Sequence, residues 1–229
     1  MPETALIVGA GSGLSASLAR LFHKEGIQVA LAARQTDKLD NLCAETNAKA
    51  YACDASSLQD VEKLFAALDT DFGSIDTVVY NPSARVRGPF IELDPEDVHR
   101  AINITAYGAF LVAQAALKRM ADKKKGNVLF TGASAGVKGY PQSASFAMGK
   151  FAMRGLAQSL AREFHPQGIH IAHFVIDGGI RSDRRQEPAD RPDSFLDPDA
   201  IAETYLHIMR QPRNSWSWEI ELRPYVENF

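Results

Sequence analysis

The residues with the clearest chemical meaning form a glycine-rich turn near the start of the chain. Gly9, Gly11 and Gly13 follow a short apolar run and precede a helical pattern that begins at Leu14. Glycines let a backbone turn tightly and approach a pyrophosphate, and the N–H groups of the next helix can bind that anion. The alternative is a tight turn that binds no ligand. Strand, glycine turn and helix in this order favour a dinucleotide site, in which we include Ser12.

Arg34 indicates which dinucleotide this site binds. It follows the second expected strand, at 27–32, where a dinucleotide-binding fold contacts the ribose of its cofactor. A carboxylate at this place would bind the 2′-hydroxyl of NAD, but the chain has Ala33 and then Arg34. A cation fits a 2′-phosphate. We therefore predict NADP(H), the alternative being that Arg34 is a solvated surface arginine.

Lys150 is the candidate chemical residue in the second half of the chain. It lies early in the longest helix that the apolar periodicity predicts, at about 146–164. Phe146 lies four residues earlier, one helical turn away, and its ring has no proton to exchange. The pair therefore combines a possible proton or hydrogen-bond donor with an inert aromatic ring.

Alternating strands and helices must position these residues. Strands that are continuous apolar runs between helices predict a parallel sheet covered on both faces. The fold class is therefore α/β, a Rossmann-type doubly wound parallel sheet of about seven strands with helices on both faces. We expect one domain over 1–229, with a variable substrate loop at about 178–198. The expected strands are 4–8, 27–32, 49–53, 75–80, 127–131, 169–176 and 216–222, and the main helices are 36–46, 58–68, 95–120, 146–164 and 198–209.

Composition excludes several other classes of protein. The 229 residues carry a net charge of −3, which gives no reason to expect nucleic acid or an anionic membrane as a partner. No stretch approaches the roughly 20 apolar residues of a membrane span, and the N-terminus has no signal-peptide core. Cys43 and Cys53 have no histidine at metal-ligand spacing. We expect a cytoplasmic protein with packing cysteines, no metal site and a small-molecule substrate.

The ordered set of motifs resembles the classical short-chain dehydrogenase/reductase family over nearly the whole chain. The glycine motif is Gly9-x-x-x-Gly13-x-Ser15, with serine where the family usually has a third glycine. The resemblance implies that Asp54 contacts the adenine and that Asn81 keeps one position of the family's Asn-Asn-Ala-Gly run. It further implies that Asn103 and Lys150 are the asparagine and lysine of the catalytic tetrad. Where the family meets the nicotinamide, this chain has Gly179, Ile180 and Ser182.

Two departures from the family concern the chemistry itself. The family's catalytic tyrosine, four residues before the lysine, corresponds to Phe146, so the chain is an atypical member. The family's serine corresponds to Ala133, or to Ser134 if the alignment slides by one residue. General acid catalysis contributes about 10²- to 10⁴-fold, so ordinary ketone reduction should be severely weakened unless another group replaces the tyrosine. The candidates are Lys150 itself, a water held with Asn103, Ser134, Ser143, Tyr140 and Tyr107, the two tyrosines having packing or surface roles as alternatives.

Two functions are therefore compatible with the sequence. The first is an NADP(H)-dependent oxidoreductase with an altered proton donor, acting on a carbonyl or alcohol or on an activated C=C bond. The arginines of the 181–191 loop would then bind an anionic substrate, a solvated loop being the alternative. The second is a catalytically impaired cofactor binder, either a sensor or a partner subunit. His165 and His173 are expected to be structural, and the resemblance implies a homodimer or homotetramer paired through the two long helices.

Overall fold

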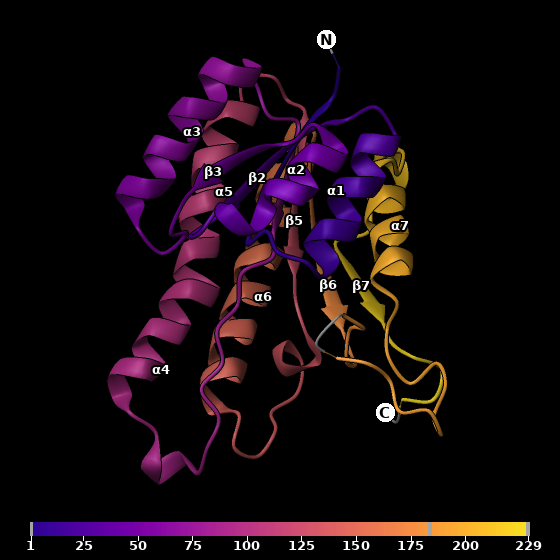
Figure 1. Cartoon of the computed structure of the whole chain (residues 1–229). Coiled ribbons are helices and arrows are strands. Elements are labelled where there is room, and N and C mark those ends of the chain that lie inside the picture. The colour runs from indigo at the N-terminus through magenta and orange to yellow at the C-terminus, as the bar shows by residue number, and fades with distance from the viewer. Residues whose placement is uncertain (1, 183–184, 228–229) are drawn as a thin grey trace.

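Seven strands form one parallel sheet in the computed structural model, which describes residues 2–182 and 185–227 (Figure 1). The strand order is β3-β2-β1-β4-β5-β6-β7, so the connection changes direction between β1 and β4. This confirms the expected α/β fold with about seven parallel strands. The strands are β1 (Thr4–Val8), β2 (Gln28–Ala33), β3 (Lys49–Ala52), β4 (Thr77–Tyr80), β5 (Gly126–Thr131), β6 (Ile169–Ile176) and β7 (Glu219–Leu222).

Burial explains why the central strands are continuous apolar runs. All five residues of β1 and all eight of β6 are buried, because helices cover both faces of the sheet. The register pairs Val8 with Ala32 on one side and with Tyr80 on the other. The carboxyl ends of β1, β2 and β4 therefore lie at the same edge of the sheet, and the segments that follow them meet there.

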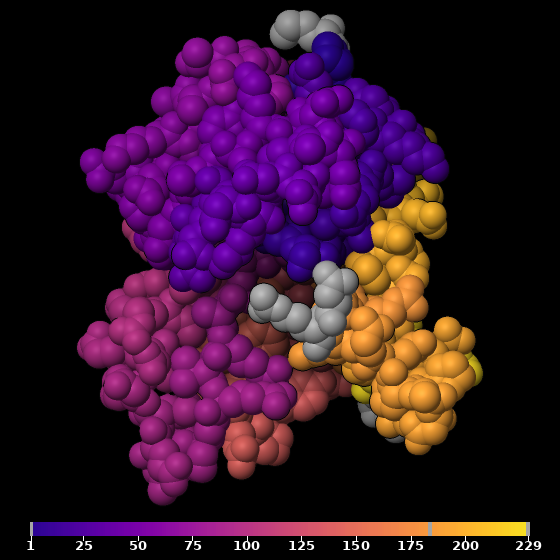
Figure 2. Space-filling model, viewed as in Figure 1, coloured from indigo at the N-terminus to yellow at the C-terminus, as the bar shows by residue number. Residues whose placement is uncertain are grey.

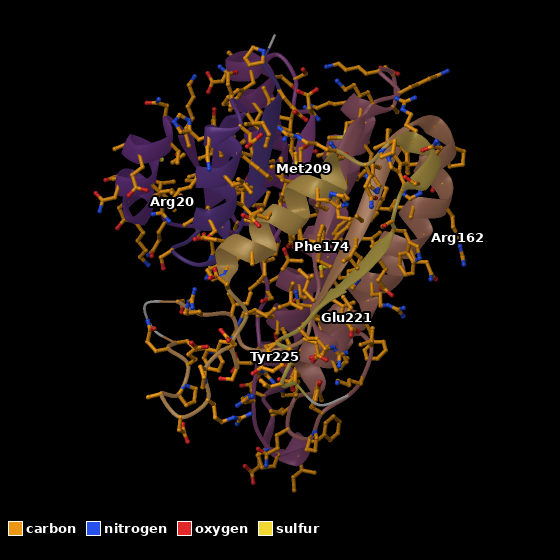
Figure 3. All side chains as sticks on the ribbon, turned by 90° about the vertical axis from the view of Figure 1, so that its right-hand side faces the viewer. Arg20, Arg162, Phe174, Met209, Glu221 and Tyr225 are labelled. Carbon is orange, nitrogen blue, oxygen red and sulfur yellow. The ribbon has the colours of Figure 1, made fainter. Side chains whose placement is uncertain are left out.

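Two separate cores flank the sheet. On one face, the sheet packs against α1 (Leu14–Lys24), α2 (Asp40–Thr46) and α7 (Pro198–Met209). Figure 3 looks onto this side, where α7 ends at Met209 and lies over the strand that carries Phe174. The rings of Phe174 and Tyr205 stack with their centroids 3.6 Å apart. On the other face, the sheet packs against α3 (Leu58–Phe72), α5 (Gly108–Met120) and α6 (Ala144–Phe164).

The region expected to be helical at 95–120 is helical throughout but contains a π-helical turn. It consists of α4 (Pro95–Ile102), a π-helical turn at Asn103–Tyr107, and α5. Such turns displace backbone groups from the α-helical pattern and are frequent at functional sites. The buried hydroxyl of Tyr80 donates a hydrogen bond to the carbonyl of Ile104 inside this turn. The apolar periodicity of the sequence does not distinguish a π-helical turn from an α-helical one, so this turn could not be predicted.

The last strand is shorter than expected. Trp216 and Trp218 precede β7, and the Trp216 ring stacks on His170 with centroids 4.6 Å apart. Short 3₁₀ turns complete the described chain, at Asp37–Leu39, Phe90–Glu92, Ser134–Gly136, His165–Gln167 and Arg213–Ser215.

Candidate nucleotide and active site

The glycine turn after β1 is joined directly to the turn after β4. Gly9 has φ of +80°, and a Cβ there would lie 2.8 Å from the nitrogen of Pro82. Ser15 Oγ donates to the carbonyl of Gly9 at 3.1 Å, and Asn81 Nδ2 donates to Ser15 Oγ at 2.8 Å. Ser15, which replaces the expected third glycine, therefore connects the two turns. This close approach leaves no room for a side chain at position 9.

The first turn of α1 is open to an anion. Gly13 caps the helix without a side-chain hydrogen bond, so the first backbone N–H groups, beginning at Leu14, are not satisfied by a cap. A Cβ at Gly11 or Gly13 would meet no atom within 4 Å. The space above the turn is thus free for a ligand, and Ser12 is exposed beside it. These features are what a pyrophosphate site requires.

A groove of about 800 Å³ begins at this turn and crosses the carboxyl edge of the sheet. Figure 2 shows the surface hollowed below the indigo N-terminal segment. The groove brings together four of the residues singled out in the sequence. These four residues are Gly9, Arg34, Asp54 and Asn81. Lys38 and Ile104 also line the groove.

Asp54 is held in its charged form. Its Oδ1 accepts hydrogen bonds from the backbone N–H of Ser56 at 2.9 Å and from Ser56 Oγ at 2.7 Å. The hydroxyl hydrogen bond, the backbone hydrogen bond and the nearby Arg34 charge together hold the pKa of Asp54 below its usual range, against the opposing effect of burial. A fixed carboxylate here can accept hydrogen bonds from a ligand in the groove.

Lys38 is a groove cation that the sequence analysis missed. It lies four residues after Arg34 in the 3₁₀ turn Asp37–Leu39, and both side chains line the same part of the groove. Its Nζ donates to Gln35 Oε1, which keeps the ammonium beside that wall. The available signal was that Lys38 closely follows Arg34 in the segment after β2. It was overlooked because 36–46 looked like one polar surface helix.

Lys150 is buried where α6 packs against β5. Its side chain is 2% exposed, and Nζ donates to the carbonyl of Thr131 at 2.6 Å. Burial lowers the pKa of Lys150 to about 7. On the same helix, a Cβ at Gly149 would lie 2.9 Å from Cβ of Thr105, so α6 touches the π-helical turn that begins at Asn103. Lys150 and Asn103 thus belong to two contacting elements, neither residue lining the 800 Å³ groove itself.

This buried lysine makes stability depend on pH. The pKa is about 7 in the folded protein and near 10.5 in the unfolded chain. Between these values the unfolded state binds more protons, so native stability rises with pH. Lys150→Met removes the cost of burying the charge. We expect the stability advantage of this variant over the native apoprotein to be larger at pH 6 than at pH 9 by roughly 2 kcal/mol. Urea unfolding at both pH values measures it, and equal differences would contradict the lowered pKa.

Two cations lie close to the Phe146 ring. The half-buried ring has the guanidinium carbon of Arg85 4.8 Å from its centroid and Lys150 Nζ 5.8 Å away. Arg85 Nη2 also donates to Ser143 Oγ at 2.9 Å. Arg85 was missed by the sequence analysis because it lies sixty-one positions before Phe146, in a segment with no helical or strand period.

The other hydroxyl candidates have separate surroundings. Tyr107 is 46% exposed and stacks on Phe110, so the alternative of core packing for this tyrosine was wrong. Tyr140 is 40% exposed, with Lys138 Nζ 5.8 Å from its ring centroid. Ser143 Oγ is buried and accepts from Arg85. Ser134 begins a 3₁₀ turn that packs on Lys150, since a Cβ at Gly136 would lie 3.2 Å from the Lys150 carbonyl.

The loop after β6 lies at the same edge of the sheet but does not line the groove. Ile180 forms a bridge with Leu196, Gly179 lies against Phe195, and the backbone of Ser182 exchanges hydrogen bonds with that of Arg185. The contact of Gly179, Ile180 and Ser182 with a nicotinamide therefore stays a prediction. Residues 183–184 of this loop lie outside the described part of the chain.

His173 is buried and belongs to a polar network with the half-buried Glu219 and Arg154. Its Nδ1 lies 3.0 Å from Glu219 Oε2, and Glu219 accepts two hydrogen bonds from Arg154 at 2.6 and 2.8 Å. Burial lowers the pKa of His173 to about 4, so the ring is neutral and donates from Nδ1 to the carboxylate. His165 Nε2 lies 3.1 Å from the backbone nitrogen and 3.0 Å from the carbonyl oxygen of Ile171. Both contacts agree with a structural role for these histidines.

A parallel sheet with helices on both faces and a groove at the point where the strand order changes direction is a Rossmann-type fold. Residues 3–192 match the short chain dehydrogenase family, and the chain belongs to that family of oxidoreductases. An uncharacterized oxidoreductase of Staphylococcus aureus (strain N315) is 28% identical over 228 residues, covering 97% of each chain. The crystal structure of a short-chain dehydrogenase from Rhodopseudomonas palustris is 30% identical, with a TM-score of 0.85 over 97% of this chain and 99% of that one.

The fold is shared more widely. An alcohol dehydrogenase from the archaeon Thermococcus sibiricus, complexed with 5-hydroxy-NADP, has a TM-score of 0.89 at 23% identity and covers 100% of this chain and 99% of that one. Actinorhodin polyketide ketoreductase with NADPH has the same TM-score at 22% identity, over 100% of this chain and 98% of that one. Among the described residues, no helix has the length and apolarity that a membrane crossing needs.

Proposed function

We propose that this protein is an NADP(H)-dependent oxidoreductase that acts on a carbonyl or an activated C=C bond without a tyrosine as proton donor. The observation that carries the proposal is the buried Lys150 ammonium beside the Phe146 ring, close to the groove with the glycine turn. By the family resemblance, Phe146 corresponds to the family's tyrosine, and Ala133, or Ser134 if the alignment slides by one residue, corresponds to its serine. NADP or NADPH in the related Thermococcus and actinorhodin structures adds support for the cofactor.

The residues of this chain suggest how such a reaction proceeds. When bound, the cofactor supplies a hydride to the substrate carbon, and negative charge then develops on the substrate oxygen. Lys150, with a pKa of about 7, can both stabilise that charge and deliver a proton near neutral pH. Asn103, on the contacting π-helical turn, can hold a water that passes the proton on. Reduction of an activated C=C bond depends less on a proton donor than carbonyl reduction does, because the enolate that forms needs stabilisation more than immediate protonation.

The choice of NADP(H) rests on Arg34 and Lys38. Arg34→Ala should weaken NADPH binding by about tenfold, and the double variant with Lys38→Ala by about 100-fold, because each removes a charge-assisted contact with the 2′-phosphate. NADH affinity should change less than twofold. Fluorescence titration of both nucleotides measures this, with Lys63→Ala on the exposed face of α3 as a matched control. Equal losses for NADPH and NADH would contradict the assignment of these cations to the 2′-phosphate.

The proposed function is tested by NADPH oxidation against ketones, quinones and enones. We expect turnover with at least one enone or quinone and much slower reaction with simple ketones. The absence of a hydroxyl at both Ala133 and Phe146 favours a second candidate, a cofactor-binding sensor or a partner subunit of an active relative. Tight NADPH binding without oxidation by any acceptor would support that candidate and count against the enzyme.

A further inference from the structure

Arg85 is held in a fixed position above the Phe146 ring. The segment that carries it follows β4 and is hydrogen-bonded to α6: the backbone N–H of Val86 donates to Ser145 Oγ at 3.0 Å, and Ser145 Oγ donates to the carbonyl of Val86 at 3.0 Å. The N–H of Ala84 donates to Thr105 Oγ1 at 3.1 Å. Both hydroxyl side chains are buried. The position of Arg85 is therefore set by the same helices that position Lys150 and Asn103.

The guanidinium itself remains available to a ligand. Its carbon lies 4.8 Å from the centroid of the Phe146 ring and Nη2 donates to Ser143 Oγ, yet the residue is exposed. A guanidinium has five N–H donors, so most of them are not used in these contacts. Contact with an aromatic ring attracts a guanidinium without consuming its donors.

The charges of two further arginines act on Arg85. Arg87 follows on the same segment, and Arg185 comes from the loop after β6; in Figure 2 that orange loop and the purple-magenta segment after β4 face each other below the groove. Burial, and then the charges of Arg87 and Arg185, lower the pKa of the Arg85 guanidinium. We call Arg85, Arg87 and Arg185 the arginine cluster.

No carboxylate neutralises this cluster within residues 2–182 and 185–227. Other arginines near it are paired: Arg181 with Asp197 and Arg223 with Asp177. The three members of the arginine cluster form no salt bridge with a described carboxylate. Like charges held together without a counterion are unfavourable, and an anion that binds between them relieves the repulsion.

The cofactor does not account for these charges. We assign the glycine turn and the N-terminus of α1 to its pyrophosphate, and Arg34 and Lys38 to its 2′-phosphate. None of the arginine cluster lines that groove. Arg85 instead lies beside the Phe146 ring, with its guanidinium carbon 4.8 Å from the ring centroid, and Lys150 Nζ lies 5.8 Å from the same centroid. A short ligand that reaches Lys150 with one end can therefore contact Arg85 with the other.

We propose that the arginine cluster binds an anionic oxygen group, carboxylate or phosphate, carried by the substrate a few bonds from its reacting carbon, with Arg85 as the principal ligand. The inference rests on the proposed function, since it places the reacting carbon beside Lys150. Arg85 offers a bidentate contact of the kind that carboxylates and phosphates accept. Arg87 and Arg185 add charge at the rim.

Binding to the NADP⁺ complex tests this without requiring turnover. The probes are oxo acids of three to six carbons, each paired with its own methyl ester, and the corresponding hydroxyketone phosphates paired with the free hydroxyketones; calorimetry gives each Kd. At least one anionic probe should bind about tenfold or more tightly than its neutral partner. The acid and phosphate arms identify which anion is preferred.

Arg85→Gln should weaken binding of the preferred anion by about tenfold while changing the affinities for its neutral partner and for NADP⁺ less than twofold. Arg185→Gln should have a smaller effect of the same kind. Arg162→Gln, an exposed arginine of α6, is the control. Equal affinity for every anion and its neutral partner would overturn the inference, as would an anion preference that survives Arg85→Gln. Anion binding through Arg85 without turnover in the acceptor panel would uphold the site while rejecting the oxidoreductase.

Discussion

Lys150→Met is expected to lower kcat/KM for NADPH-dependent reduction by at least about 10³-fold, because it removes both the proton donor and the charge that stabilises the substrate oxygen. The side chains have similar length, and position 150 is buried, so the variant should keep the fold. NADPH affinity should fall by only about tenfold, as expected for the loss of one charged hydrogen bond. A large loss in the chemical step with a modest loss in binding separates a catalytic from a purely cofactor-binding lysine.

Stopped-flow measurement of NADPH oxidation at saturating cofactor gives the chemical step directly. Lys63→Met, the same replacement on the exposed face of α3, is the control. A rate that falls no further than NADPH affinity would show that Lys150 only binds the cofactor. The native rate should also respond to pH around 7, where the pKa of Lys150 lies, and this response should be absent in the variant.

Introducing the missing hydroxyls should have the second largest effect. Phe146→Tyr combined with Ala133→Ser is expected to raise the rate of simple ketone reduction by about 10²-fold, because general acid catalysis contributes about 10² to 10⁴. The Phe146 ring is half-buried and has Lys150 on one side, so a phenol there would meet an ammonium that can lower its pKa. Reduction of enones should change much less.

Steady-state rates with a ketone and an enone of matched skeleton measure this selectivity. Phe151→Tyr, which adds a hydroxyl on an exposed part of the same helix, should change neither rate. If the double variant gains no ketone reduction, the difference from the family is not confined to the proton donor. Arg85 would then be the first residue to examine, since its guanidinium carbon lies 4.8 Å from the centroid of the Phe146 ring.

The sequence predicted the parts of the site that depend on short-range pattern. Apolar runs, helix periods and glycine turns indicated a parallel α/β sheet and assigned Gly9 and Arg34 to a nucleotide site, whereas Asp54 and Asn81 followed from the family resemblance; all four line one groove. The direct contact between Gly9 and Pro82 follows from the same topology. The fold class was therefore accessible to reasoning from residues alone, and the groove residues were accessible in part.

The parts that escaped prediction depend on contacts between distant segments. Arg85 is positioned by hydrogen bonds to α6 that no local pattern encodes. The π-helical turn at Asn103–Tyr107 adds no signal to the apolar period of the helix. The lowered pKa of Lys150 arises from its complete burial against β5, which depends on how α6 packs rather than on its sequence neighbours.

The most direct test of the central claim is transfer of deuterium from [4-²H]NADPH to carbon in a single turnover, with protein in excess over cofactor and a panel of enones and ketones as acceptors. Mass spectrometry of the products reports the transfer even when steady-state turnover is slow. An oxidoreductase without the family's tyrosine predicts deuterium on carbon of at least one product, and none with Lys150→Met. NADPH bound tightly by the native protein, with no deuterium in any product, would contradict the account.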